Sequence, residues 1–476
     1  MDYRDWIDSF RCPDCRAPFS FTAVQSKAPT SAQGTPSDDR RGDHEADCYG
    51  LLQCRCFRYP VVDGIPILLK GNVGLFDQGG NFESKGPAVE EIATLVAQGL
   101  GAEALVKCLG FTPRFDVLNN LPGWRLWHSE TFQALGRRRV EARLRAMLDR
   151  DRRQLSAEDW FEFYFSGPTA SDPNHLPYYR NRIVLPRTLA AFSLLRLLPA
   201  ADKPVLDIAC GYGPFAHYLT RRRNATPVIG FDFNFYLVWG QKYWIAPDAV
   251  FICADGNKRL PFADGTFSAV FCSDAFMYLK DKTGSLAEID RCAPGKPVIL
   301  SRVGNKTASP REVRGDSHSA DGYMELLANG WPRIFGEYAL VRDYLARRNP
   351  LRAEPTDPAD LQWDKWLHFV LNSQSLQDVD VDPALEWPHQ VGNLFFSPMF
   401  ERRIMDGGKY RLDLKFPTIW FAYQNGDMYG YHGDLIECSG DALQRARRGE
   451  LDSEVRNLLD RFVIIGLPDR YLKSRH

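Results

Sequence analysis

The sequence lacks long apolar runs and has no excess of charge of either sign. No uninterrupted apolar run reaches the roughly 18 residues that a membrane-spanning helix needs, so we expect no membrane helix. The first residues, Met1 to Trp6, are charged and contain no apolar signal core, which disfavours secretion and favours a cytoplasmic location. The 59 Lys and Arg residues almost balance the 60 Asp and Glu residues, which argues against a nucleic-acid coat but is compatible with a local basic patch.

Cysteine is too sparse for a disulfide framework, because the 476-residue chain holds 11 cysteines. Several of them lie beside apolar runs, where a thiol is usually a small hydrophobic side chain. A separate group stands near the N-terminus, namely Cys12, Cys15, Cys48, Cys54 and Cys56. This distribution predicts a reducing compartment and one metal site. The length predicts about two or three domains, and 44% hydrophobic with 25% charged residues is a globular composition.

Short continuous apolar runs alternate with helical patterns between residues 201 and 305. Continuous apolar runs are typical of strands buried on both faces, and strand–helix repetition implies a parallel sheet with right-handed crossovers. The predicted fold class is therefore α/β, with a doubly wound, mostly parallel sheet. The expected strands are Val205–Ile208, Val228–Phe231, Val250–Cys253, Ala269–Cys272 and Val298–Leu300.

The regions on either side of these strands have other patterns. Near the N-terminus, Asp63-Gly64 separates two short apolar runs and predicts a hairpin. Apolar residues at three- and four-residue spacing predict helices at Val89–Leu109, Glu130–Leu148 and Ile183–Leu198. After the expected sheet the pattern is mixed, with helices predicted at 322–329, 338–347, 360–372 and 440–461 and strands at 411–415, 418–423 and 462–465.

A turn of small residues follows the first expected strand and opens a helix at Phe215. The turn, Asp207-Ile208-Ala209-Cys210-Gly211-Tyr212-Gly213, would let a ligand approach the backbone and the free N–H groups of the helix. A glycine-rich turn alone is a weak sign of a nucleotide site. Acids also end the next strands, and in an open parallel sheet such strand ends converge on one crevice. These acids are Asp232, Asp255 and Asp274.

Residues 183 to 305 resemble a class I S-adenosylmethionine-dependent methyltransferase. The resemblance lies in the Asp207 turn, the spacing of the acids, and the segments 260–270 and 286–295. It implies that Asp207 contacts the methionine amino group directly or through water, that Asp232 binds the ribose and that Asp255 with Gly256 binds the adenine. The cofactor-binding residues that it implies are Asp207, Ala209, Gly211, Gly213, Asp232, Phe233, Asp255, Gly256 and Ser273.

Two details qualify this resemblance. Ala209 stands where the family often has glycine, which is a small change. The alternative is a similar sheet that holds another nucleotide. A redox dinucleotide site would need a third glycine shortly after Gly213, but Pro214 and Phe215 stand there.

Catalysis of methyl transfer needs few special groups. Displacement at carbon requires alignment of the nucleophile, the methyl group and the sulfur, and a base only when the acceptor is protonated. The family keeps substrate-facing residues after the fourth strand, where Asp274 stands, and covers the cofactor from the segment that holds Tyr178. The resemblance therefore implies Asp274 and Tyr178 as candidate catalytic residues, although a hydrogen-bonded core position is the commoner role of a single tyrosine.

Two close cysteine pairs, Cys12 with Cys15 and Cys54 with Cys56, can supply the four thiolates of a tetrahedral zinc site. With Tyr59 to Pro66 they resemble the small zinc ribbon that activates tRNA, rRNA and release-factor methyltransferases. The second pair has one intervening residue instead of two, so Cys48 is an alternative to Cys54 or Cys56. Four protein ligands would leave no open position, which predicts a structural zinc ion.

These signals divide the chain into four expected regions. They are a zinc ribbon at 1–72, a helical accessory region at 73–182, the S-adenosylmethionine-binding core at 183–308 and an α+β region at 309–476. The last region would complete the core and shape the substrate pocket. Class I methyltransferases usually end in a strand pair, which 418–423 and 462–465 would supply after a long insertion.

The favoured function is methyl transfer to a small molecule or glycan in a bacterial biosynthetic pathway. An RNA methyltransferase is an alternative, since the basic segment from Arg137 to Arg153 could contact phosphate, although such a segment is usually a solvated helix face. The motif that handles planar amines is missing, because Ser273-Asp274-Ala275-Phe276 stands in its place. A third alternative uses the cofactor for another reaction. We expect no membrane partner, and the oligomeric state stays open.

Overall fold

The computed structural model of the protein describes residues 2–25, 48–74, 86–110, 130–150, 154–166, 174–222, 225–308, 315–381, 393–426, 430 and 435–473. None of the helices in these segments is long and apolar enough to span a membrane. The strands of the central sheet are β5 (Val205–Ile208), β6 (Val228–Asp232), β7 (Val250–Cys253), β8 (Ala269–Ser273), β9 (Val298–Gly304), β10 (Arg333–Gly336) and β11 (Trp366–Leu371).

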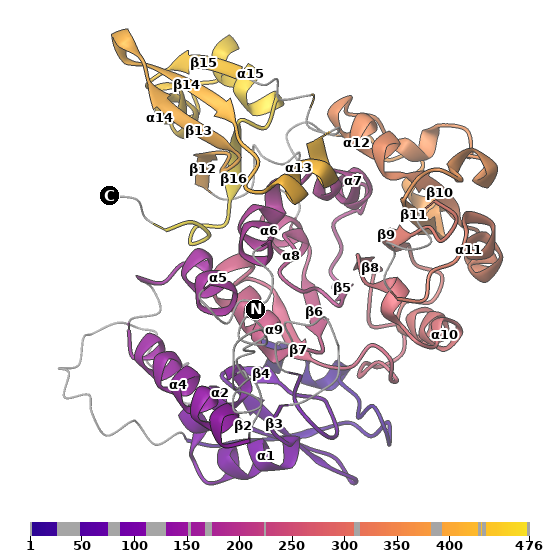
Figure 1. The fold of residues 1–476 in the computed structure, drawn as a ribbon. Coiled ribbons are helices and arrows are strands. Elements are labelled where there is room, and N and C mark those ends of the chain that lie inside the picture. The colour runs from indigo at the N-terminus through magenta and orange to yellow at the C-terminus, as the bar shows by residue number, and fades with distance from the viewer. Residues whose placement is uncertain are drawn as a thin grey trace.

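These strands form a 7-stranded sheet in the order β10-β11-β9-β8-β5-β6-β7 (Figure 1). Strands β5 to β9 pair in parallel, and β11 runs antiparallel to both β9 and β10. Neighbouring residues of one strand belong to different hydrophobic clusters, as Val205 and Leu206 do, so both faces of the sheet are buried. The predicted doubly wound, mostly parallel α/β sheet is confirmed.

Helices cover both faces of the sheet. One hydrophobic cluster includes residues of α7 (Pro186–Leu195), α8 (Phe215–Arg221), α9 (Phe235–Gly240) and α12 (Glu337–Leu345). The other includes residues of α10 (Lys282–Cys292) and α11 (Ala320–Leu326). The predicted helices at 183–198, 322–329 and 338–347 are thus present with shifted ends.

The strand pair that ends the sheet, β10 and β11, was not predicted from the sequence. Residues 360–372 were expected to be helical, but they contain β11, which is buried along most of its length. A short apolar run is compatible with a buried strand or a buried helix, and periodicity does not separate them. Residues 418–423 were expected to form a strand, but Thr418 caps the helix α13 (Ile419–Asn425) by accepting a hydrogen bond from the Phe421 N–H. The strand near 462–465 exists as β16 (Ile464–Leu467), but it pairs with β12 (Asn393–Phe396) outside the central sheet.

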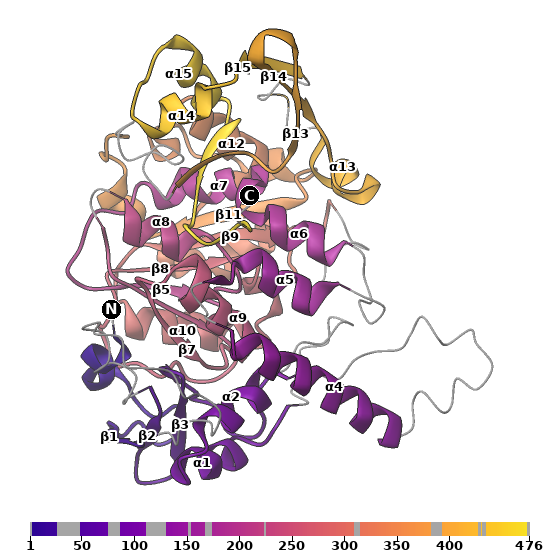
Figure 2. The same cartoon turned by 90° about the vertical axis from the view of Figure 1, so that its left-hand side faces the viewer.

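The N-terminal residues form an antiparallel sheet of β1 (Ser20–Ala23), β2 (Gly50–Gln53), β3 (Arg58–Val62) and β4 (Ile65–Pro66), preceded by a short 3-10 helix (Tyr3–Ser9). The predicted hairpin turn is confirmed, since Asp63 and Gly64 both have positive φ, 53° and 71°. The chain after the hairpin lies beside β7, where the Leu68 N–H donates to the Cys253 carbonyl at 2.8 Å. The N-terminal sheet therefore lies at the β7 edge of the central sheet (Figure 2).

The remaining helices and strands lie between and beyond these two sheets. The predicted helix 89–109 is two helices, α1 (Val89–Ala97) and α2 (Gly101–Leu109), because Gly99 adopts a left-handed φ of 75° between them. The helix α4 (Glu130–Leu148) has the predicted bounds. Helices α5 (Ala157–Phe165) and α6 (His175–Asn181) follow. A C-terminal unit lies far from the N-terminal sheet (Figure 1) and contains β13 (Phe400–Ile404), β14 (Lys409–Leu414), β15 (Leu435–Ser439), α14 (Ala442–Arg447) and α15 (Ser453–Asp460).

Candidate cofactor crevice and cysteine cluster

The turn between β5 and α8 has an open backbone. Ala209 and Gly211 both have positive φ, 52° and 47°, a conformation that favours glycine. A Cβ added at Gly211 would meet no atom within 4 Å, so this glycine borders open space. Gly213 is required for a different reason, because a Cβ there would lie 2.9 Å from the Phe215 ring. The turn can thus receive a ligand at Gly211 while Gly213 holds the helix close.

Asp232 ties the end of β6 to this turn. Its Oδ2 accepts a hydrogen bond from the Gly211 N–H at 3.1 Å, and its Oδ1 accepts one from the Asn234 N–H at 2.9 Å. Burial raises the pKa of the Asp232 carboxyl, and these hydrogen bonds oppose that rise. The structure therefore brings two predicted cofactor residues, Gly211 and Asp232, into direct contact.

Asp207, on β5, is the least satisfied acid of the site. Its side chain is 2% exposed, and its Oδ2 has no hydrogen-bond partner among the described residues. Burial raises its pKa to about 8, nearby Asp232 acts in the same direction, and the charge of Arg182 opposes both. A buried carboxyl oxygen without a partner costs free energy, so this atom fits a ligand that brings a cation or a donor.

The other predicted cofactor residues lie on the neighbouring strand ends. Asp255 follows β7, and its Oδ1 accepts from the Asn257 N–H at 2.8 Å. Gly256 faces Leu279, whose Cδ2 would lie 3.2 Å from an added Cβ. Phe233 lies against the chain beyond the hairpin, because a Cβ at Gly74 would meet its ring at 2.7 Å. Ser273 ends β8 beside the turn-bearing strand β5.

The two predicted catalytic residues approach the same region from different elements. Asp274 follows β8 with a φ of 58°, and its Oδ2 lies 3.2 Å from Arg302 Nη1. Tyr178, on α6, accepts a hydrogen bond at its hydroxyl from Arg182 Nη1 at 2.6 Å. Burial acts to lower the pKa of Arg182, and the Tyr178 hydroxyl and the Asp274 carboxyl both act to raise it.

Sequence reasoning missed a group of buried charged residues around Asp274. Arg302 is 8% exposed, and its Nε donates to Glu337 Oε1 at 3.2 Å. His368 is fully buried, with Nδ1 3.0 Å from the Ser301 hydroxyl, and burial lowers its pKa to about 3. An arginine inside the apolar run of β9 was the available signal. Its partners come from α12 and β11, and the sequence predicted the helix at 338–347 but not the strand β11.

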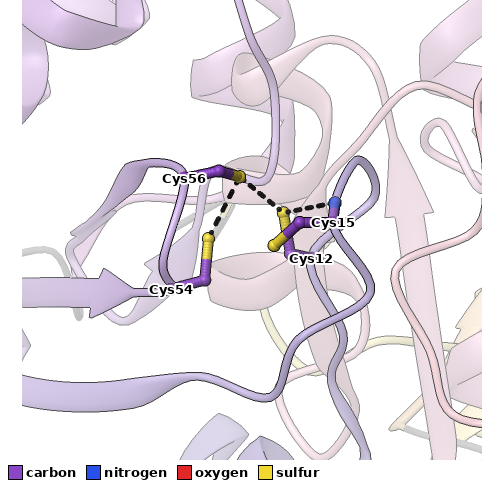
Figure 3. A group of neighbouring side chains, drawn as sticks. All are labelled: Cys12, Cys15, Cys54 and Cys56. Atoms are coloured by element: carbon purple, nitrogen blue, oxygen red, sulfur yellow. Dashed lines mark hydrogen bonds between the residues drawn. The ribbon is translucent and has the colours of Figure 1, made fainter.

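The four predicted metal ligands form one cluster (Figure 3). One sulfur atom from each cysteine lies within 4.8 Å of the others, which suits a single tetrahedral ion of the zinc type. Cys56 Sγ lies 3.5 Å from Cys12 Sγ and 3.4 Å from Cys54 Sγ. Cys48 lies outside this cluster, and its carbonyl accepts from the Gly64 N–H. The structure thus favours Cys12, Cys15, Cys54 and Cys56 over a set that includes Cys48.

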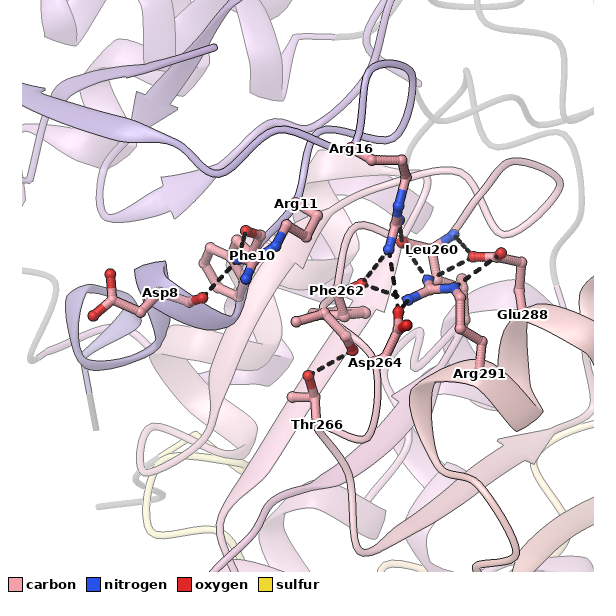
Figure 4. A network of polar contacts seen from close by, with 11 residues as sticks. Asp8, Phe10, Arg11, Arg16, Leu260, Phe262, Asp264, Thr266, Glu288 and Arg291 are labelled. Carbon is pink, nitrogen blue, oxygen red and sulfur yellow. Dashed lines mark hydrogen bonds and ion pairs between the residues drawn. The ribbon is translucent and has the colours of Figure 1, made fainter.

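The loop that holds Cys12 and Cys15 contacts the segment between β7 and β8 through Arg16 (Figure 4). Its Nη1 donates to the Leu260 carbonyl at 2.9 Å and its Nη2 to the Phe262 carbonyl at 2.8 Å. Arg291 of α10 donates to the same Phe262 carbonyl at 2.8 Å and forms an ion pair of 2.7 Å with Asp264. Two segments that carried the family resemblance are therefore held together at the contact with the N-terminal sheet.

Comparison with known proteins agrees with this arrangement. Residues 206–297 match the family model described as "Methyltransferase domain". Together with the strand order, this match defines a methyltransferase domain of the α/β class within the chain. The demethylmenaquinone methyltransferase of Deinococcus radiodurans is 32% identical over 106 residues, which are 22% of this chain and 44% of that protein. The chain thus spans less than half of the length of this curated relative.

Solved structures of low sequence identity share part of the chain. One chain from a solved complex that contains the Trm112 methyltransferase activator of Haloferax volcanii is 20% identical in sequence to this chain. The match covers 39% of this chain and 88% of that chain, with a TM-score of 0.30. A SAM-dependent methyltransferase from Aquifex aeolicus is 16% identical over 41% of this chain and 96% of that one, with a TM-score of 0.28.

Proposed function

We propose that the protein is an S-adenosylmethionine-dependent methyltransferase that acts on a small molecule or glycan. The observation that carries this proposal is the buried Oδ2 of Asp207, which has no hydrogen-bond partner in the described part of the chain and stands in the same turn as the open backbone of Gly211. A cofactor amino group would supply the missing partner of Asp207. The match of residues 206–297 to a methyltransferase domain supports the same cofactor.

The residues present fit this cofactor along the strand ends. Asp207 would hold the methionine amino group, and the backbone of Ala209, Gly211 and Gly213 would border the cofactor. Asp232 would accept from the ribose hydroxyls, although one of its oxygens already holds the Gly211 N–H. In the same proposal Asp255 and Gly256 contact the adenine, with Phe233 and Ser273 beside them.

For methyl transfer the protein mainly has to align the acceptor atom with the methyl group. S-adenosylmethionine supplies an activated methyl group on a sulfonium, so the protein must hold the acceptor atom in line with it. Asp274 lies after β8 with Arg302 at 3.2 Å, where its carboxylate could accept a proton from the acceptor. Tyr178 lies on α6 and would position the acceptor or cover the cofactor.

We further propose that the N-terminal sheet is a zinc ribbon with a structural ion held by Cys12, Cys15, Cys54 and Cys56. The donor set and the spacing within 4.8 Å support zinc. The ribbon would brace the β7 edge of the sheet, near the adenine side of the crevice. We retain the four expected regions, 1–72, 73–182, 183–308 and 309–476, as a proposed division, with β10 and β11 from the last region completing the central sheet.

The ion pairing of an arginine on α4 favours a small acceptor over RNA. Its Arg145 is already in an ion pair of 2.7 Å with Glu103 of α2, as expected for a solvated helix face. The near balance of charge over the whole chain supports the same preference.

Incubation with methyl-labelled S-adenosylmethionine tests the proposal. The full chain is incubated separately with a bacterial small-molecule extract, with purified cell-wall glycan and with total RNA. We expect label in the first or second acceptor, loss of labelling in Asp232→Asn, and normal labelling in the exposed control Asp321→Asn. Label in RNA alone would overturn the substrate class, and bound cofactor without any transferred label would indicate another reaction.

A further inference from the structure

A cavity of about 940 Å³ lies between helix α6 and the C-terminal unit, which stands above that helix in Figures 1 and 2. Small-molecule sites in proteins have volumes of about 300–1,000 Å³. The walls of the cavity come from α5, α6, the segment from β12 to β13, the residues after β14, α14 and the C-terminal segment. None of the proposed cofactor residues is among the described residues that line it. The cavity is therefore a candidate site distinct from the cofactor crevice.

Apolar side chains form much of the wall. Six of them are Leu176, Phe395, Phe396, Phe400, Phe416 and Leu443. Phe400 is 8% exposed, and the other five are only half-buried although they are large and apolar. Removing such surface from water is favourable, so the wall suits a ligand with an apolar body.

Arg447 of α14 is held in place against this wall. Its Nε donates to the Leu394 carbonyl at 2.9 Å, and its guanidinium carbon lies 5.3 Å from the centroid of the Phe395 ring. Among the described residues it forms no ion pair, and its two Nη atoms have no hydrogen-bond partner. A guanidinium group with two open N–H groups can bind two oxygens of a carboxylate or a phosphate.

Two of the acids in the lining are already neutralised by cations of the lining. Glu158 forms an ion pair of 2.9 Å with Arg180, and Glu401 forms one of 3.1 Å with Lys415. These four charges therefore cancel in pairs and leave Arg447 without an acid.

The remaining charged groups leave an excess of positive charge. Lys473 pairs at 3.3 Å with Asp159, which lies outside the lining. Two cations, Arg402 and Arg447, then stand against one acid, Asp469, and none of the three forms an ion pair with another described residue. The lining thus favours a ligand with a negative charge.

The α6 wall also holds a polar atom whose hydrogen bonding is incomplete. Asn181 lines the cavity and is 4% exposed, and its Nδ2 donates to the Pro177 carbonyl at 2.8 Å. Its Oδ1 has no partner in the part of the chain that the structure describes. A buried amide oxygen without a donor costs free energy, which a hydroxyl or amine of a ligand would offset.

We propose that this cavity binds a small organic anion, namely a carboxylate or phosphate ester with an apolar body. The apolar body packs on the phenylalanine side chains, and the anionic group binds the Nη atoms of Arg447. Helix α6 separates this anion from the cofactor turn, since its Tyr179 ring lies 5.4 Å from the ring of Tyr212. The inference goes beyond the proposed function, because the site needs neither the cofactor nor any residue of the crevice.

Calorimetry on the full chain without added cofactor tests the site. The probes share one apolar body and are naphthoate, naphthyl phosphate and the neutral analogue naphthamide. We expect one or both anions to bind at least about tenfold more tightly than naphthamide, and the tighter anion indicates the charged group that the site prefers. If neither anion binds, or if both bind no more tightly than naphthamide, the inference is wrong.

Three variants locate the binding. Arg447→Gln, an exposed substitution, should weaken binding of the tighter anion roughly tenfold or more, as expected for a charge-assisted hydrogen bond. Leu443→Trp places a larger side chain in the cavity and should abolish binding. Arg448→Gln is the matched control and should bind as the wild type does, because Arg448 pairs with Glu450 at 2.6 Å and is not among the described lining residues.

Unchanged anion affinity in Arg447→Gln or in Leu443→Trp would overturn the inference. Neither result bears on the proposed function, which is decided separately by titration with S-adenosylhomocysteine.

Discussion

At the scale of single residues, Asp207 illustrates how a site can be destabilising until its ligand binds. The carboxyl is buried at the end of a parallel strand, and one oxygen has no partner among the described residues. Burial raises the pKa of the Asp207 carboxyl from its ordinary value of 3.8 to about 8 in the folded protein. Folding therefore disfavours the ionised form of this carboxyl. The penalty on stability therefore grows as pH rises and is complete above the folded pKa.

This sign predicts the effect of Asp207→Asn. At about pH 9 the variant should have a higher free energy of unfolding than the wild type, by about 1–3 kcal/mol, because no buried charge is left unpaired. Near pH 4 the difference should shrink. Urea denaturation at both pH values measures it. A variant that is less stable than the wild type at high pH would show that Asp207 is satisfied in the free protein.

The same carboxyl predicts a pH dependence of cofactor binding. Below its pKa of about 8, binding of a cationic amino group must first remove the Asp207 proton. The affinity for S-adenosylhomocysteine should therefore rise from pH 6 to pH 8 and then level off. Calorimetry across this range measures it, with Asp207→Asn as the variant in which the rise should disappear. An affinity that is flat with pH in the wild type contradicts this role.

The clustering of the four cysteines was predicted, because they come as two close pairs along the chain. Gly211 and Asp232 follow the ends of two predicted strands, and the structure joins them by a hydrogen bond that the sequence did not predict. Arg302 was missed because its partners are distant in sequence, on α12 and β11. Such a cluster is defined by tertiary packing and has no local pattern.

At the scale of elements, the parallel strands β5 to β9 were predicted more accurately than the strands that complete the sheet. The runs for β5 to β9 carry continuous apolar residues bounded by turns, which suits parallel strands. The range 360–372, predicted as a helix, contains the end of a short 3-10 segment (Pro358–Leu361) and the strand β11. Its identity as a strand depends on pairing with β9 and β10, which local sequence does not encode.

The hairpin between β3 and β4 predicts a large local effect on stability. Asp63 is 4% exposed, and its Oδ2 accepts from Trp239 Nε1 at 2.7 Å and from the Tyr243 hydroxyl at 2.8 Å. Asp63→Ala should lower the free energy of unfolding by about 2–4 kcal/mol, because two donors lose their acceptor.

Asp63→Asn is the matched control, since its amide oxygen can accept both bonds and asparagine tolerates the left-handed conformation. It should cost under about 1 kcal/mol, within the range of one weakened hydrogen bond. Urea denaturation compares the two variants. Equal losses in both would show that the charge of Asp63, rather than its role as an acceptor, stabilises the hairpin.

At the scale of the whole molecule, the N-terminal sheet and the cofactor crevice are linked through the β7 edge. After the hairpin the chain contacts Cys253 of β7 and then pairs at Gly74 with Asn234, whose N–H holds Asp232. Disorder in the N-terminal sheet would therefore reach the acid proposed to bind the ribose.

Metal removal tests this link. We expect one zinc ion per chain by atomic emission, and chelation or Cys12→Ser should lower the Tm by roughly 5–10 °C and weaken S-adenosylhomocysteine binding. Cys48→Ser is the control, because Cys48 lies outside the cysteine cluster and its loss should leave the zinc content unchanged. Full cofactor affinity in the metal-free protein would show that the two parts act independently.

The central claim is that a sulfonium nucleotide binds across the ends of β5 and β6. Its most direct test is calorimetric titration of the full chain with S-adenosylhomocysteine, compared between the wild type and Asp232→Asn. The predicted result is one site per chain, with binding at least about tenfold weaker in the variant because the ribose loses its charged acceptor. Absence of binding to the wild type, or equal affinity in a folded Asp232→Asn variant, would contradict the claim.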